Sequence, residues 1–331
     1  MDKLIGFFSS DARPLYIEDI YRAMALPEKS IIHFRYNQKY VQDDIVSDSS
    51  KYVNREGIIF FTTGNDLEKT PEDREIKHHS IRKVRIKSIY KSEDTRYFHF
   101  LLELGDYYDC EITNTEQNKF AAFVSVKEGI NHCWIDRVKA IESYFEDILF
   151  FKYEILSKNE KKKLFPKYSK SYKDTIYQLN DESDYKILFS FYDKKNGDSK
   201  LNINDSEYID IHYKECSKIG ALIDDRYFNL STRTIHQRKK NEILKISPSL
   251  PKNSKLSYEV VTRFEITKSY KKAIFYGFLS SFLFISIVLS QVVGALIKLE
   301  KPTSCVVIVG VIALFFFFIG SSLLLSNFSK K

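Results

Sequence analysis

Three clusters of basic residues are the side chains in this sequence best suited to bind a ligand. In the first, Lys83, Arg85 and Lys87 share one face of an alternating segment, while Val84 and Ile86 occupy the other. The other two lie further along the chain: Lys161, Lys162, Lys163, Lys167, Lys170 and Lys173 with Tyr168 and Tyr172, and then Arg233, His236, Arg238, Lys239 and Lys240. Phosphate groups and stacked bases require cations beside aromatic rings. The clusters therefore predict a nucleotide or oligonucleotide site; the alternatives are anionic lipid head groups and a solvated surface.

Motifs that would indicate catalysis are absent from the sequence. It contains no GxSxG, P-loop, GxGxxG, HExxH or paired CxxC motif. His132 and Cys133 have the chemistry of a base and a nucleophile, but adjacent residues rarely face each other productively. The neighbours His78 and His79 would need further metal ligands from elsewhere in the chain. We therefore expect no enzyme, no cofactor and no metal site.

The segments that carry these clusters alternate between apolar and polar residues, with the β-branched and aromatic side chains typical of strands. Strands are predicted at 31–41, 57–63, 81–90, 97–104, 120–126, 185–191, 206–213 and 255–267. The sequence Lys-Lys-Asn-Gly at 194–197 predicts a hairpin turn. Antiparallel sheets with one solvated face explain this alternation better than helices do.

Two helices are expected among the strands. The first spans 15–25 and has Pro14 in a favourable first-turn position. The second spans 133–155, where apolar residues recur at helical spacing: Trp134, Val138, Ile141, Phe145, Ile148 and Leu149. We interpret this stripe as part of a core, with a surface for a partner helix as the alternative.

The domain organisation follows from a change in composition. Between 158 and 177 the chain is rich in Lys and poor in apolar residues, which predicts a linker. The predicted fold class is mainly β with some α: a β-rich domain over 1–157, which includes both helices, and a second, sandwich-like β domain over 178–268. With 44% apolar residues in 331, the chain is not a disordered protein.

Two uncharged apolar runs, 273–297 and 305–325, follow the predicted domains. Each is long enough for a helix that spans a bilayer, which needs about 20 residues. Neither run has the polar stripe of a core helix. The link of seven residues between them contains Pro302, so we expect an antiparallel transmembrane hairpin.

Basic residues around the two runs predict the orientation of this hairpin. They lie mostly outside it: Arg263, Lys268, Lys271 and Lys272 come before the first run, and Lys330 and Lys331 come after the second. The link has only Lys298 and Lys301, which Glu300 offsets. Positive flanks stay in the cytoplasm, and the first residues lack the features of a signal peptide. We therefore expect both termini, and the β-rich domains, on the cytoplasmic side.

Small and polar residues mark one face of the first run. Ser286, Ser290 and Gly294 recur every four residues, and Gln291 is the only strongly polar side chain in either run. Such a ridge lets another helix approach closely. Two interpretations remain open: a self-associating hairpin whose Ser and Gln residues line an aqueous path, or ordinary packing within one anchor.

This order of parts, β-rich domains followed by a pair of membrane spans, resembles that of membrane effectors in bacterial anti-phage systems such as Hailong and related nucleotide-signalling defences. The resemblance implies an oligomeric protein of the bacterial inner membrane. Its β-rich domains would bind a nucleotide or oligonucleotide signal from a partner synthase, and its hairpins would then let ions leak. Because the resemblance concerns domain order over the whole chain, it assigns no functional residue. The competing hypothesis is a membrane-tethered interaction or scaffold protein without pore activity.

Overall fold

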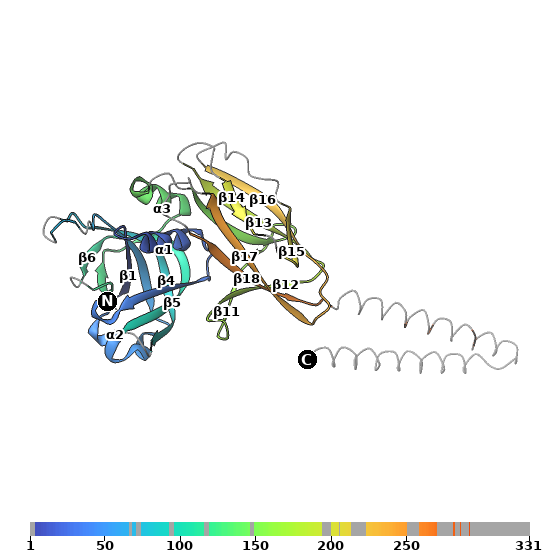
Figure 1. Ribbon diagram of the computed structural model, residues 1–331, viewed down its shortest axis with the longest axis horizontal. Helices are drawn as coiled ribbons and strands as arrows, with labels where there is room; N and C mark the ends of the chain where they lie inside the picture. Colours follow the sequence, from blue (N-terminus) through green and yellow to red (C-terminus); the bar gives the residue numbers. More distant parts are fainter. Residues whose placement is uncertain are drawn as a thin grey trace. The chain divides into compact units, whose positions relative to one another are not determined.

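Strands make up most of the computed structural model, in three sheets with short helices between them (Figure 1). The structure describes residues 4–65, 68–70, 74–92, 96–115, 119–145, 149–193, 200–204, 206–212, 223–249 and 258–269, together with Ser281, Ile285 and Gln291. The chain divides into two units, 1–268 and 269–331. The first unit contains all three sheets.

The largest sheet has eight strands, and it is formed by the first part of the chain. Its path is β2-β5-β4-β3-β1-β7-β6, with β8 paired to β5. The strands are β1 (Leu4–Ser10), β2 (Ile31–Asn37), β3 (Glu56–Thr63), β4 (Lys77–Lys91), β5 (Tyr97–Asp109), β6 (Ile112–Thr115), β7 (Ala121–Val126) and β8 (Ile130–Asn131). β1 runs parallel to β3, and the other pairs are antiparallel. The five strands predicted in this region are confirmed.

Helix α1 (Pro14–Ala25) confirms the prediction at 15–25 and covers part of this sheet. It buries Ile20, Tyr21 and Met24, in keeping with an amphipathic helix whose apolar residues face a core. Two further α-helices are shorter: α2 (Asp43–Ser47) and α3 (Trp134–Ile141). α1 is thus a structural element of the β-rich unit.

The last carbonyl groups of α1 are bound by side chains from the sheet and from α3. The guanidinium of Arg82, on β4, is 2% exposed; it donates to the carbonyls of Ala23 at 3.0 Å and Leu26 at 2.7 Å. Tyr107 Oη and Trp134 Nε1 both donate to the carbonyl of Met24, at 2.8 and 3.1 Å. A cation at a helix C-terminus is stabilised by the helix dipole. These bonds satisfy carbonyls that no further helical turn could satisfy.

The helix predicted over 133–155 is wrong beyond Ile141. α3 ends there, a 3₁₀ turn covers Glu142–Tyr144, and strand β9 runs over Phe150–Ser157. β9 has a continuous apolar start because both faces of the strand are buried at Phe150 and Phe151. Such a run cannot be distinguished from a buried helix by its spacing alone.

Two five-stranded sheets face each other in the second part of the unit. The first has the order β10-β9-β13-β16-β15, with β10 (Lys163–Leu164), β13 (Asp184–Tyr192), β16 (Ile223–Thr232) and β15 (Ile209–His212). The second has the order β11-β12-β18-β17-β14, with β11 (Lys167–Ser169), β12 (Asp174–Asn180), β18 (Val260–Thr267), β17 (Lys239–Ser249) and β14 (Lys200–Ile203). A hydrogen bond between the hydroxyls of Tyr153 and Thr262 joins the two sheets inside the core.

This sandwich begins earlier than the sequence pattern predicts. The segment 158–177, expected to be a linker, contains β10, β11 and the start of β12. The hairpin predicted at 194–197 also fails: its turn lies outside the described residues, but the strands before and after it belong to different sheets. β13 already has β9 and β16 on its two edges, so it has no free edge for β14.

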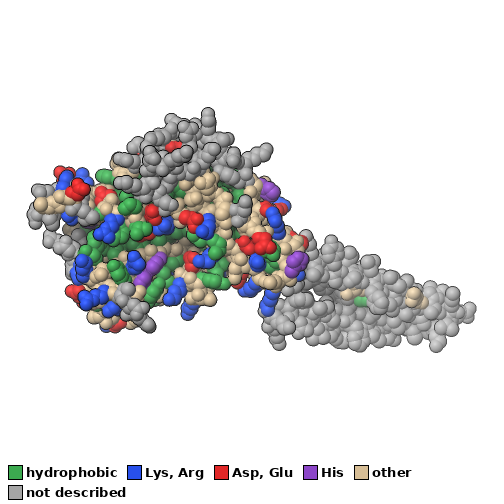
Figure 2. Space-filling model, in the orientation of Figure 1, with side chains coloured by type: hydrophobic (Ala, Val, Ile, Leu, Met, Phe, Trp, Pro, Cys, Tyr) green, Lys and Arg blue, Asp and Glu red, His purple; other side chains and the backbone are tan. Residues whose placement is uncertain are grey.

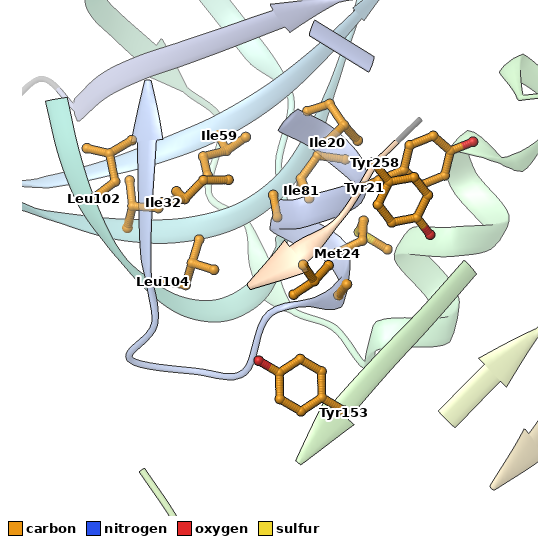
Figure 3. Packing of buried hydrophobic residues seen from close by; sticks show 14 of the residues in the cluster. Ile20, Tyr21, Met24, Ile32, Ile59, Ile81, Leu102, Leu104, Tyr153 and Tyr258 are labelled. Atoms are coloured by element: carbon orange, nitrogen blue, oxygen red, sulfur yellow. The ribbon is translucent and has the colours of Figure 1, made fainter. Parts of the chain in front are cut away.

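The eight-stranded sheet and the sandwich are joined through α1 and share one hydrophobic core. The rings of Tyr21 on α1 and Tyr258, just before β18, are parallel at 4.5 Å between centroids, and Figure 3 shows them side by side. Arg22 Nε donates to the carbonyl of Glu259 at 3.3 Å, and the backbone N–H of Ile31 donates to Thr175 Oγ1 at 3.3 Å. The two β-rich parts therefore form one packed body within the first unit.

Candidate functional site

The first predicted cluster lies on the outer face of β4, as its alternation indicates. Val84 and Ile86 are buried, while Arg85 is exposed. Each of the three cations is engaged by a neighbouring side chain: Lys83 Nζ lies 4.2 Å from the ring centroid of Tyr108, Arg85 lies 3.8 Å from Glu56, and Lys87 lies 3.0 Å from Glu103. Two of its three charges are thus offset by carboxylates.

The third predicted cluster lies at one end of the sandwich, between β16 and the start of β17. Its cations also meet carboxylates: Arg233 contacts Asp210 through two nitrogens at 2.5 and 2.7 Å, Lys239 lies 3.0 Å from Glu265, and Lys240 lies 3.9 Å from Glu207. The hydrogen bonds from Arg233 hold the pKa of Asp210 below its ordinary value. Arg238 is exposed, and its carbonyl accepts from the backbone N–H of Lys268 at 3.0 Å.

Most of the residues predicted to pack against another transmembrane helix or to line a pore lie outside the described part of the chain. This applies to Ser286, Ser290 and Gly294, whereas Gln291 is helical and exposed. Both predicted spans, 273–297 and 305–325, are outside it except for Ser281, Ile285 and Gln291. Among the residues that the structure does describe, no helix has the length and apolar character needed to cross a bilayer.

The histidines considered for catalysis or metal binding are held by hydrogen bonds. His132 Nδ1 and Cys133 Sγ both bond to the same oxygen of Asp136, at 3.3 and 2.9 Å, so the thiol donates to a carboxylate. His78 and His79 point to opposite faces of β4, where each bonds to a threonine hydroxyl of β3. Within the described ranges, no group of three or more His, Cys, Asp or Glu side chains could hold a metal ion.

A row of aromatic and cationic side chains crosses the outer face of the eight-stranded sheet. Arg35 on β2 and Tyr90 on β4 lie directly opposite His99, which is on the intervening strand β5. The rings of Tyr90 and His99 are parallel, with centroids 4.8 Å apart. His33, two residues before Arg35, bonds through Nε2 to His99 Nδ1 at 2.8 Å. We call this set, with Tyr97 and Lys173, the histidine–tyrosine surface.

His33 and His99 form a flat pair of rings. Their planes differ by only 6°, and the distance between centroids is 5.0 Å. The bonded nitrogens are 2.8 Å apart, and the centroid distance is larger than this by about the sum of the two ring radii. The bonded nitrogens therefore lie on the line between the centroids, and the two rings are coplanar and meet edge to edge. Nε2 of His99 bonds in turn to Ser92 Oγ at 2.8 Å, which fixes the ring in its plane. His33 is exposed to solvent.

Two cations complete the surface, and neither forms an ion pair with any residue that the structure describes. The guanidinium of Arg35 lies 5.0 Å from the ring centroid of Tyr97, and Lys173 Nζ lies 4.3 Å from that of Tyr90. Burial, followed by the positive charges of Arg35 and Lys173, lowers the pKa of His99. Burial, followed by His99 and Arg35, lowers the pKa of His33. The pair is therefore neutral near neutral pH, in a positive local field.

The histidine–tyrosine surface can be traced only partly to the sequence. Alternation in 31–41 and 97–104 places His33, Arg35, Tyr97 and His99 on the polar faces of predicted strands. What brings them together is the pairing of β2 with β5 and of β5 with β4, which alternation does not encode. Lys173, in the predicted linker, reaches Tyr90 from the turn between β11 and β12.

No protein-family model matches the sequence, and no curated protein matches it.

Proposed function

We propose that this protein is a membrane-embedded effector, an oligomeric pore or membrane-disrupting protein that a nucleotide or oligonucleotide signal controls in bacterial anti-phage defence. The observation that carries the proposal is the pair of uncharged runs, 273–297 and 305–325, which begin a few residues after β18. An uncharged run of this length is stable in hydrocarbon and costly in water. The resemblance in domain order supplies the role in defence.

The connection between the β-rich unit and the apolar runs supports control by a ligand. β18 is a central strand, paired with β12 on one side and β17 on the other. Just before it, Tyr258 and Glu259 contact α1. A displacement of α1 against the sandwich would therefore act directly on the strand that leads into the runs. The ligand can shift the closed–open balance only by its differential affinity for the two states.

A tethered interaction protein is the second candidate. It is favoured by the carboxylates that offset Arg85, Lys87, Arg233 and Lys239, because a neutralised surface attracts anions weakly. In this case the hairpin would serve only as an anchor, and any apolar hairpin of similar length would replace it.

Reconstitution of the full chain in liposomes tests the proposal. Native mass spectrometry from mild detergent should show a closed oligomer of several chains with retained nucleotide, and planar-bilayer recording should show conductance. The variants Ser286→Leu, Ser290→Leu and Gln291→Leu should abolish conductance, whereas Ile287→Leu, an apolar exchange in the same run, should preserve it. A monomer or dimer without conductance would reject the pore in favour of the tether, and failure to insert into liposomes would reject both.

A further inference from the structure

We infer that the histidine–tyrosine surface binds the phosphate–base unit of a nucleotide, either free or within a short single strand. The inference rests on the proposed function, which requires the β-rich unit to recognise a ligand of this class. It differs from the sequence-based expectation in location: the ligand lies across β2, β5 and β4 at His33, Arg35, Tyr90, His99 and Lys173, and of these only Lys173 belongs to a predicted basic cluster.

The charges of this surface favour an anion more than those of the first and third predicted clusters do. At those two clusters, binding a phosphate would first require separating ion pairs such as Arg233–Asp210, whose nitrogens and oxygens lie at 2.5 and 2.7 Å. Arg35 and Lys173 lie over the rings of Tyr97 and Tyr90 instead. A cation on a ring face keeps its full charge and its remaining N–H donors for a ligand. Arg35 lies opposite His99 on one side, and Lys173 lies over Tyr90, which is opposite His99 on the other side, so the two cations flank one position.

The rings of the surface suit a planar base. Bases stack on flat aromatic side chains irrespective of sequence. The coplanar rings of His33 and His99 form a flat polar area larger than one imidazole, and Tyr90 lies parallel to it. In Figure 2, histidine side chains lie at the position that β5 has in Figure 1, among hydrophobic, Lys and Arg side chains. Stacking area and phosphate-binding cations are thus adjacent.

The surface is also held in place before any ligand arrives. All of its residues except Lys173 lie on the paired strands β2, β5 and β4, and Ser92 fixes the ring of His99. Lys173 adopts a positive φ of 50°, a conformation that non-glycine residues rarely take, at the turn that brings its side chain over Tyr90. The bond from Ile31 N–H to Thr175 Oγ1 ties this turn to β2. Little ordering is needed on binding, which favours affinity.

Fluorescence anisotropy of the full chain in detergent tests the inference. The probes are a labelled single-stranded oligodeoxyadenylate of about ten nucleotides, a labelled ATP, and inorganic phosphate as a competitor. Three variants remove one part each: Tyr90→Leu removes a stacking ring, Arg35→Ala a cation on β2, and Lys173→Ala a cation on the turn. Arg233→Ala is the matched control, because it removes an exposed arginine that is paired with Asp210.

The inference predicts that each surface variant weakens binding by about tenfold while Arg233→Ala changes it little. Affinity should also fall with rising salt. Emission from Trp134, the only tryptophan in the chain and a buried one, shows whether each variant is folded. If ATP binds as the oligonucleotide does, the site takes a free nucleotide; if only the oligonucleotide binds, the site takes a strand.

Three results would overturn the inference. The first is absence of binding by the unaltered chain, and the second is a loss of affinity in Arg233→Ala as large as that in the surface variants. The third is complete competition by inorganic phosphate together with no effect of Tyr90→Leu, which would indicate an anion site without base recognition. Anisotropy measures binding alone, so it separates this inference from the membrane role. If the chain inserts and conducts but binds neither probe, this inference is rejected and the membrane role stands. If the chain binds the probes but does not insert, the membrane role is rejected and this inference stands.

Discussion

Asp19 provides a test of how this structure balances burial against ion pairing. The residue lies on α1 with its carboxylate 3.1 Å from Arg22 Nη1. Burial raises its pKa from 3.8 to about 6, against the lowering effect of Arg22, and Glu18 adds a smaller increase. A pKa that is higher in the folded chain means that folding favours the protonated acid. The contribution of Asp19 to the free energy of unfolding is therefore fully present below about pH 4 and is lost as the pH rises through about 6.

The magnitude follows from the two pKa values. Their difference of about 2.2 corresponds to about 3 kcal/mol, the cost of keeping Asp19 ionised in the folded chain above pH 6. The variant Asp19→Asn removes this charge while keeping the shape of the side chain. The pKa of about 6 already includes the lowering effect of Arg22, so the loss of this ion pair is contained in the difference. We expect Asp19→Asn to raise the free energy of unfolding by up to about 3 kcal/mol near pH 8 and to have little effect near pH 4.

Urea unfolding of the full chain in detergent, followed by the emission of Trp134, measures this effect. The side chain of Asp43 offers the matched control: it also pairs with a cation at 3.1 Å, that of Lys119, but is 88% exposed. Asp43→Asn should lower stability by less than about 1 kcal/mol. If Asp19→Asn is less stable than the unaltered chain near pH 8, where Asp19 is ionised, the ion pair outweighs burial and the reasoning is refuted.

Three further predictions use the same assay. Arg82→Met should lower the free energy of unfolding by about 3–5 kcal/mol, because the carbonyls of Ala23 and Leu26 lose a buried donor; a loss below about 1 kcal/mol would contradict this role. Tyr21→Phe should be neutral or stabilise by about 1 kcal/mol, since the Tyr21 hydroxyl is buried without a hydrogen-bond partner among the described residues. Burial lowers the pKa of four histidines: His33, His78, His79 and His99. As the pH falls, these histidines are therefore protonated in the unfolded chain before they are protonated in the folded chain. The free energy of unfolding should therefore fall as the pH drops below about 6.5. This trend is clearest in Asp19→Asn, which removes the opposite contribution, and an unfolding midpoint that stays constant between about pH 7 and pH 5 would count against it.

The strands with one solvated face could be predicted from the sequence. Segments such as 31–41 and 97–104 alternate between apolar and polar residues over part of their length and carry the β-branched and aromatic residues that favour strands. The corresponding strands β2 and β5 begin at the predicted residues. Helix α1 could be predicted equally well, because Pro14 marks its first turn and its apolar residues recur at helical spacing.

Two strands that are buried on both faces, β1 and the start of β9, escape prediction, whereas β3, which is also buried on both faces, is predicted from its β-branched and aromatic residues. In β1, Phe7 and Phe8 point to opposite faces and enter two different hydrophobic clusters, so the segment shows no alternation. β9 was mistaken for a helix for the same reason. The histidine–tyrosine surface was missed because it depends on which strands are neighbours, and residues such as Arg35 and Lys173 lie far apart in the sequence.

The position of β18 has a mechanical consequence. A strand paired along both sides, with Tyr177 and Leu179 of β12 on one side and Ile243 of β17 on the other, resists a pull along its axis by shear. All of its backbone hydrogen bonds then share the load, whereas a strand at the edge of a sheet can be peeled away one bond at a time. Tension applied to the chain at Lys268 would therefore be carried into the whole sandwich before this strand detached. The protein can withstand force at this junction.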